Sequence, residues 1–209
     1  MAPSSASSDR LSPNFWESRY QAGTTRWDLG QASPPLTHLL QQPDAPPPGK
    51  AIVLGCGRGH DAVFLAQQGF DVVGVDYAPS AIAAATQAAA AAQVQAEFWQ
   101  RNIFELLPEY AEQFDYVVEH TCFCALEPAL RDRYIDLVHN LLKADGQYIA
   151  VFFTHGRTGG PPYGIQPATL KQLFSQQFEI LQLEPAQHSV PSRQNEEHIG
   201  VFQKQEATY

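Results

Sequence analysis

The chain has 209 residues, which is enough for one sizeable domain and short for two. Its formal net charge of −9 disfavours binding to nucleic acid or to anionic membrane surfaces, because both require a basic patch. Apolar residues make up 44% of the chain, yet no apolar run approaches the roughly 20 residues that a membrane span needs.

The N-terminal residues 1–12 lack the charged and then apolar pattern of a secretory signal, so they predict a disordered, solvated tail. The three cysteines, Cys56, Cys122 and Cys124, are an odd number in a chain without an export signal. Reduced thiols and a cytoplasmic location are therefore expected. Because no set of histidines and cysteines has zinc spacing, we expect no metal site.

Residues 13–48 predict a helical lid and a linker, and residues 13–209 as a whole a single domain. Ser12 suits the N-cap of the first helix, with Pro13 at its first position. A short helix and a proline-rich stretch follow up to residue 49.

From Lys50 onward, strand and helix patterns alternate. Strands are predicted over residues 51–56, 70–76, 96–100, 114–120, 146–154, 178–186 and 198–205, and helices over residues 59–69, 79–94, 126–143 and 166–177. This alternation predicts an α/β fold, a doubly wound, mostly parallel seven-stranded sheet with helices on both faces. The last two strands are expected to form an antiparallel pair.

The stretch "AIVLGCGRGHD", residues 51–61, places Gly55, Gly57 and Gly59 directly after the first strand. In such a sheet the ligand binds outside the carboxyl ends of the strands, and glycines let the backbone approach it. Asp76 ends the second strand, where a carboxylate can accept hydrogen bonds from the ribose hydroxyls of an adenosine group. These residues predict a nucleoside site, the alternative being a tight turn that binds nothing.

The glycine spacing is G-x-G-x-G, whereas nicotinamide cofactors favour G-x-G-x-x-G. Asp61 falls in the first turn of the following helix, where its charge would repel a pyrophosphate. S-adenosylmethionine has no phosphate and carries an ammonium and a sulfonium, so it suits an acidic site better. Asn102 alone is more typical of a turn residue, but its position after the third strand also favours a contact with adenine.

Further strings around this loop identify a family. The strings "FWESRYQAGTTRWDLG", "VLGCGRGHDAVFLA", "GVDYAPSAI", "CFCALEPALR" and "GGPPYGI" together resemble the thiopurine S-methyltransferase-like family. Within it they are most similar to the branch of thiol, thiocyanate and halide methyltransferases. The likeness runs from about Pro13 to Lys204 in one motif order, and it implies the Rossmann-like fold of class I S-adenosylmethionine-dependent methyltransferases.

The resemblance also implies positions for the cofactor. Trp16, Tyr20 and Trp27 would form an aromatic lid. The glycine loop would contribute Gly55 and Gly57, and the end of the second strand would contribute Asp76. Asn102 and Ile103 would contact the adenine, and His120 would lie against both cofactor and substrate. The tryptophans could instead be plain core packing.

For the methyl acceptor, the resemblance implies that Tyr163 reaches the acceptor side of the pocket. Trp27, Phe123 and Arg193 are further candidates for the pocket wall. Arg193 could attract an anionic acceptor, or it could be a solvated loop arginine. Aromatic rings there, including Trp16, could hold the sulfonium by cation–π attraction. His120 or Tyr163 could assist deprotonation of a thiol, or each could simply shape the pocket. The chain departs from the plant branch around "EHTCFCAL", where an aromatic residue would be expected in place of His120 and another near Cys122.

The sequence thus predicts transfer of a methyl group from S-adenosylmethionine to a thiol, bisulfide, thiocyanate or halide by in-line displacement, with S-adenosylhomocysteine as the second product. Alternatives are methylation of thiopurines or of selenium and tellurium oxyanions, a non-catalytic sensor of the cofactor, and a nicotinamide dehydrogenase. The expected partner is a small molecule, not nucleic acid or a membrane. A monomer or weak dimer is expected.

Overall fold

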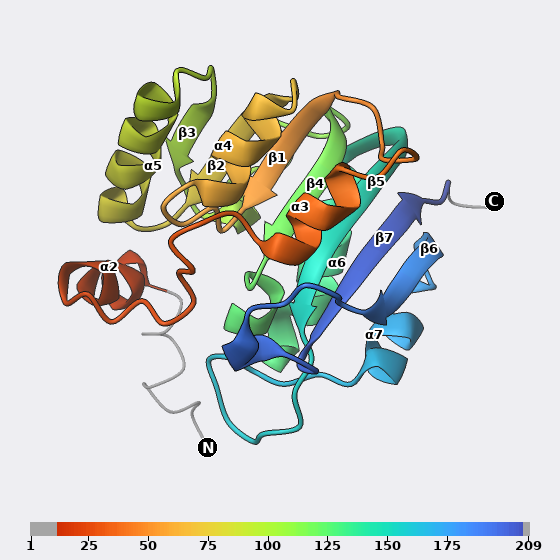
Figure 1. The fold of residues 1–209 in the computed structure, drawn as a ribbon. Coiled ribbons are helices and arrows are strands. Elements are labelled where there is room, and N and C mark those ends of the chain that lie inside the picture. Colours follow the sequence, from red (N-terminus) through yellow and green to blue (C-terminus); the bar gives the residue numbers. More distant parts are fainter. Residues whose placement is uncertain (1–11, 207–209) are drawn as a thin grey trace.

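A computed structural model describes residues 12–206 of the chain, so the predicted tail lies outside the described residues apart from Ser12. Seven strands form one sheet in the order β3-β2-β1-β4-β5-β7-β6 (Figure 1). Their bounds are β1 Lys50–Leu54, β2 Asp71–Asp76, β3 Glu97–Gln100, β4 Phe114–His120, β5 Leu142–Phe153, β6 Phe178–Pro185 and β7 Glu197–Lys204.

Strands β1 to β5 pair in parallel, and β7 runs antiparallel to both β5 and β6. The antiparallel pair predicted at the end of the chain is therefore confirmed, as is the mostly parallel, doubly wound α/β fold. A parallel arrangement brings the carboxyl ends of β3, β2, β1 and β4 to one edge of the sheet, where the order reverses between β1 and β4.

Helices cover both faces of this sheet, as Figure 1 shows. Their bounds are α2 Pro13–Gln21, α3 Pro34–Leu40, α4 His60–Gln67, α5 Pro79–Ala92, α6 Arg131–Leu141 and α7 Pro167–Phe174. Among the described helices, none is long and apolar enough to cross a membrane.

Alternation along the central strands divides the core into two layers. In β5, Tyr148 and Phe152 join the cluster that packs on α6 and α7, whereas Ile149 and Val151 join the cluster on α3 and α4. Successive side chains of a strand point to opposite faces, so a strand with continuous apolar sequence feeds both layers.

Two local predictions can be compared with the structure. The predicted cap of the first helix is confirmed, because the Ser12 side chain accepts a hydrogen bond from Phe15 N at 3.3 Å. The single helix predicted over residues 126–143 is wrong at both ends. A 3₁₀ turn at Pro128–Leu130 precedes α6, and Leu142 adopts extended backbone and begins β5.

Candidate active site

A cavity of about 1220 Å³ opens at the carboxyl ends of β3, β2, β1 and β4. The segment from α2 to residue 27 forms one wall, and the turns after the strands form the others. The cavity brings together most of the residues that the sequence predicted for cofactor and acceptor: Trp16, Tyr20, Trp27, Gly55, Asp76, Asn102, Ile103 and Arg193.

The glycine loop lies against the turn that follows β4. Gly55 has a φ of +63°, and a Cβ built on it would meet Cys122 Sγ at 2.9 Å, so no larger residue fits without a shift. Gly57 N donates a hydrogen bond to Asp76 Oδ2 at 2.9 Å. The loop is therefore fixed to the end of the neighbouring strand, with its backbone exposed to the cavity at Gly55.

Asp76 has a nearly buried carboxylate that accepts hydrogen bonds from the backbone. Its Oδ1 accepts from Ala78 N at 2.9 Å and its Oδ2 from Gly57 N. Burial raises the pKa of Asp76 above its ordinary value, although these N–H donors act in the opposite direction. A carboxylate has about four acceptor sites, so besides Ala78, Gly57 and Tyr77 it can still accept from a hydroxyl in the cavity.

Three aromatic residues of the N-terminal segment pack on one another. The ring centroids of Trp16 and Trp27 lie 5.5 Å apart, those of Tyr20 and Trp27 lie 5.7 Å apart, and Trp27 Nε1 donates to the Tyr20 hydroxyl. The group packs on Ala78 and Ala81 at the start of α5. The structure thus places it between the cavity and α5.

Asn102 and Ile103 line the same cavity after β3. The Asn102 side chain accepts a hydrogen bond from Phe104 N at 3.0 Å and caps the short 3₁₀ turn Ile103–Glu105. Asn102 therefore does act as a turn residue, and its position in the cavity wall leaves it available to a ligand as well.

Sequence reasoning missed Glu119, which organises the turn after β4. The side chain is 1% exposed, and its Oε2 accepts from Cys122 N at 2.7 Å and from Phe123 N at 3.1 Å. Burial raises the pKa of Glu119 to about 7, against the effect of those two N–H donors. The sequence of the predicted strand over residues 114–120 did not indicate that the Glu119 side chain points inward.

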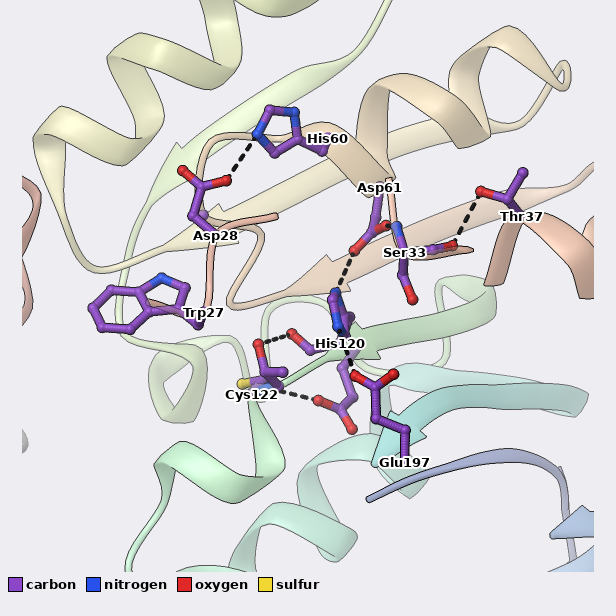
Figure 2. A network of polar contacts seen from close by, with 12 residues as sticks. Trp27, Asp28, Ser33, Thr37, His60, Asp61, His120, Cys122 and Glu197 are labelled. Carbon is purple, nitrogen blue, oxygen red and sulfur yellow. Dashed lines mark hydrogen bonds and ion pairs between the residues drawn. The ribbon is translucent and has the colours of Figure 1, made fainter. Parts of the chain in front are cut away.

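His120 and Asp61 do not line the large cavity; they belong to a neighbouring polar network (Figure 2). His120 Nδ1 lies 3.4 Å from Asp61 Oδ2, and its Nε2 lies 3.6 Å from Glu197 Oε1. Asp61 Oδ1 accepts from Ser33 N at 2.7 Å. The sequence predicted that the charge of Asp61 acts on the cofactor. This prediction is corrected, because the Asp61 carboxylate faces Ser33 and His120 and does not line the large cavity.

Two residues predicted for the acceptor pocket also lie elsewhere. Phe123 is 1% exposed and packs edge-on against Tyr134 and Phe152 in the core, so its ring is not part of the cavity wall. Tyr163 is half-buried beside the cavity, with its backbone N donating to Cys124 O, and Pro161 and Pro162 before it line the wall in its place.

Other residues of the cavity wall were not singled out from the sequence. They are chiefly arginines and apolar side chains, namely Arg19, Arg26, Tyr77, Arg101, Phe104, Leu126, Arg133, Phe153, Arg157 and Glu196. Tyr77 directly follows Asp76 and could have been found from that position. The others come from segments whose approach to the cavity depends on the tertiary fold.

Comparison with known proteins identifies the family. The model of the thiopurine S-methyltransferase (TPMT) family matches residues 11–209. The chain belongs to this family. Within the thiopurine S-methyltransferase family, it is 33% identical over 194 residues to thiocyanate methyltransferase 1 of Arabidopsis thaliana, covering 90% of this chain and 84% of that protein. It is 24% identical over 181 residues to a thiopurine S-methyltransferase of Legionella pneumophila, covering 79% and 82%.

Solved structures of low sequence identity share the fold. A Burkholderia thailandensis 1,6-didemethyltoxoflavin-N1-methyltransferase with bound S-adenosylhomocysteine aligns with a TM-score of 0.77 at 20% identity, covering 99% of this chain and 93% of that one. TehB from Haemophilus influenzae aligns with a TM-score of 0.64 at 16% identity, covering 81% and 61%. The predicted S-adenosylmethionine-dependent methyltransferase is thus confirmed.

The cavity fits this cofactor. Its volume exceeds the range of about 300–1,000 Å³ that is usual for small-molecule sites, which leaves room for a second molecule. The backbone at Gly55 is open, Asp76 offers carboxylate lone pairs, and aromatic faces of Trp16 and Trp27 suit a sulfonium. Among the described residues, no group of three or more histidine, cysteine or acidic side chains could hold a metal ion.

Proposed function

We propose that the protein transfers the methyl group of S-adenosylmethionine to a small, soft anion, such as thiocyanate, bisulfide, a halide or a thiolate. The family supplies the methyl donor, and the relative at 33% identity is named for thiocyanate. The features of the cavity wall support an acceptor that is negatively charged and needs no strong base.

The charge of the cavity wall is the observation that carries this proposal. Although the whole chain has a net charge of −9, six arginines and only two carboxylates line the cavity. The carboxylates are Asp76 and Glu196, and the arginines are Arg19, Arg26, Arg101, Arg133, Arg157 and Arg193. A basic cleft in an acidic protein concentrates anions at its mouth.

The groups that line the cavity also provide little base strength. The described residues that line the cavity include no histidine. Of the two carboxylates, Asp76 is assigned to the ribose of the donor, and Glu196 is paired with both Nη atoms of Arg157. Hydrogen bonds from Arg157 lower the pKa of Glu196 below its ordinary value, which makes it a weak base. An acceptor that is already an anion at neutral pH needs no proton removed.

Part of the cavity wall is apolar. It is formed by Cys124, Ala125, Leu126, Phe153 and Pro161. When bound, S-adenosylmethionine supplies an electrophilic methyl group on a sulfonium, and an anionic acceptor neutralises that charge as it attacks in line. The apolar wall would exclude water that stabilises the separated charges, and the pocket would hold the acceptor in line with the methyl group.

The positions of the residues in the cavity wall suggest their roles. Asp76 would accept from the ribose hydroxyls, Asn102 and Ile103 would flank the adenine, and the aromatic group of Trp16, Tyr20 and Trp27 would cover the donor. His120 and Tyr163 would act through their neighbours, since neither lines the large cavity.

The test is formation of S-adenosylhomocysteine from S-adenosylmethionine with thiocyanate, iodide, bisulfide, small thiols, thiopurines, selenite and tellurite. Turnover with the soft anions is expected to exceed that with the other acceptors. Saturable binding of S-adenosylmethionine with no turnover on any acceptor would replace the proposal with a non-catalytic sensor. Preferred turnover of thiopurines or of the oxyanions would contradict the proposed acceptor class.

A further inference from the structure

The strap, residues 24–33, connects the lid helix α2 to α3 and carries Trp27 into the cavity wall. Side chains from the glycine loop and from α4 hold it. Asp28 Oδ2 lies 2.7 Å from Arg58 Nε, and its Oδ1 lies 3.1 Å from His60 Nε2. Figure 2 shows Asp28 and His60 facing one another beside Trp27.

At the far end of the strap, the backbone of Ser33 is bound to the first turn of α4. Its N–H donates to Asp61 Oδ1 at 2.7 Å, and Asp61 in turn faces His120 (Figure 2). The Ser33 hydroxyl, by contrast, is buried and has no hydrogen-bond partner in the described part of the chain. Only the backbone of Ser33 therefore contributes to this attachment.

Arg193 makes the attachment at Trp27. Its Nη2 donates to Trp27 O at 2.7 Å, and its Nη1 donates to Glu197 Oε1 at 3.1 Å and to His120 Nε2 at 2.7 Å. The residue is 7% exposed, although it stands on a short 3₁₀ turn, Pro191–Arg193. Three of the five N–H donors of the guanidinium are thus committed to the protein.

His120 lies between Arg193 and the carboxylates of Asp61 and Glu197. A guanidinium has donors only, so Arg193 binds Nε2 in the neutral ring, whose proton then lies on Nδ1, toward Asp61. The two carboxylates act the other way: against the effect of burial, their hydrogen bonds raise the pKa of His120 to about 9. The chain of contacts therefore runs from Trp27 O through Arg193, His120 and Asp61 back to the strap at Ser33. These mostly buried or half-buried polar groups link the strap at Trp27 to the strap at Ser33.

We propose that Arg193 is a positioning residue that holds the strap, and with it Trp27, closed over the methyl donor. This rests on the proposed role of the aromatic group as a cover for the donor. Because Arg58 attaches the same strap to the glycine loop, and His60 and Asp61 attach it to the start of α4, the lid and the loop keep one relative position. The guanidinium acts here through the backbone of Trp27, and attraction of the acceptor falls to the other arginines of the wall.

Hydrogen exchange of residues 24–33 tests the attachment without any acceptor. Arg193→Lys and Arg193→Met should each speed exchange in the strap about tenfold and weaken calorimetric binding of S-adenosylmethionine by a similar factor, since a lysine cannot reproduce the forked contacts. Arg157→Met is the contrast: this residue lines the cavity and pairs with Glu196. It should raise the KM of an anionic acceptor and leave strap exchange unchanged.

A second pair of variants leaves Arg193 in place. Ser33→Pro removes the hydroxyl and the N–H that Asp61 accepts, and it places the proline ring where that hydrogen pointed; the φ of −56° at this position suits proline. Ser33→Ala keeps that N–H and removes the unpartnered hydroxyl. Faster strap exchange in Ser33→Pro than in Ser33→Ala is expected.

Acceptor kinetics distinguish two roles of Arg193, which are positioning of the strap and attraction of an anionic acceptor. Loss of positioning should lower turnover by the same factor for an anionic acceptor and for a neutral thiol. Unchanged strap exchange and donor affinity in both Arg193 variants, with a raised KM for anions alone, would overturn the proposal. Exchange and donor binding need no turnover, so failure of the proposed acceptor class would be seen separately.

Discussion

The carboxylate of Asp76 has two sets of partners to satisfy. It fixes the glycine loop through Gly57 N and the start of α5 through Ala78 N, and it faces the cavity where the donor would bind. Since each oxygen already holds one N–H, a substitution at this residue disturbs both the loop and the ligand contact. Asparagine retains the size of the side chain and one of the two acceptor oxygens.

Asp76→Asn should therefore weaken calorimetric binding of S-adenosylmethionine by about 10- to 100-fold, the range for lost hydrogen bonds to a charged group. The control is Asp71→Asn, at the exposed start of the same strand. Equal donor affinity in Asp76→Asn and the wild type would show that the ribose role is wrong.

Glu119 predicts a pH dependence of stability. Its folded pKa, raised to about 7 by burial, exceeds the ordinary value of 4.5, so between these values the folded state binds more protons than the unfolded state. The free energy of unfolding should fall as the pH rises through this window, by about 3 kcal/mol in total.

Glu119→Gln should remove that dependence, because an amide does not titrate while its oxygen can still accept from Cys122 N. Denaturant unfolding at pH 5 and pH 8 measures the effect as the difference between wild type and variant, which cancels other titrating groups. A difference that stays constant with pH would contradict the assignment.

At the scale of elements, the glycine loop also sets how closely α4 approaches α5. A Cβ on Gly59 would meet Ala85 Cβ at 2.7 Å, whereas one on Gly159 would meet nothing within 4 Å. Both residues have a similar positive φ, of +80° and +83°. The pair therefore separates backbone strain from packing.

Gly59→Ala and Gly159→Ala should share a backbone penalty of about 1–2 kcal/mol. Gly59→Ala should cost about 1–3 kcal/mol more, because the added methyl overpacks the contact with α5. The free energies of unfolding from denaturant titration give the comparison. Equal losses in the two variants would mean that α4 and α5 can move apart at no cost.

The sequence was most informative about individual elements. Apolar runs and glycine or proline boundaries predicted the strands and most helices closely, because these signals act within a few residues. The segment 126–143 shows the limit: its helical periodicity was real, but Pro128 and the extended backbone at Leu142 confine the helix to Arg131–Leu141. Such ends depend on local backbone conformation that periodicity does not encode.

At the scale of the whole molecule, residues at strand ends were predictable as site residues, since parallel strands bring their carboxyl ends to one edge. The partners of His120 and Arg193 were not. Trp27 O and Arg193 are separated by 166 positions in the chain, and Ser33 N and Asp61 by 28. Only the assembled fold places the strap between the glycine loop and β7.

The chemistry of the whole molecule rests on an anionic acceptor reaching a basic, partly apolar cavity. S-adenosylmethionine with a deuterated methyl group, incubated with equal concentrations of thiocyanate, iodide, bisulfide, a neutral thiol, a thiopurine, selenite and tellurite, tests this most directly. Mass spectrometry of the products should find the deuterated methyl group chiefly on the soft anions. Labelled product dominated by the neutral thiol, the thiopurine, selenite or tellurite, or the absence of any labelled product above the enzyme-free background, would contradict the account.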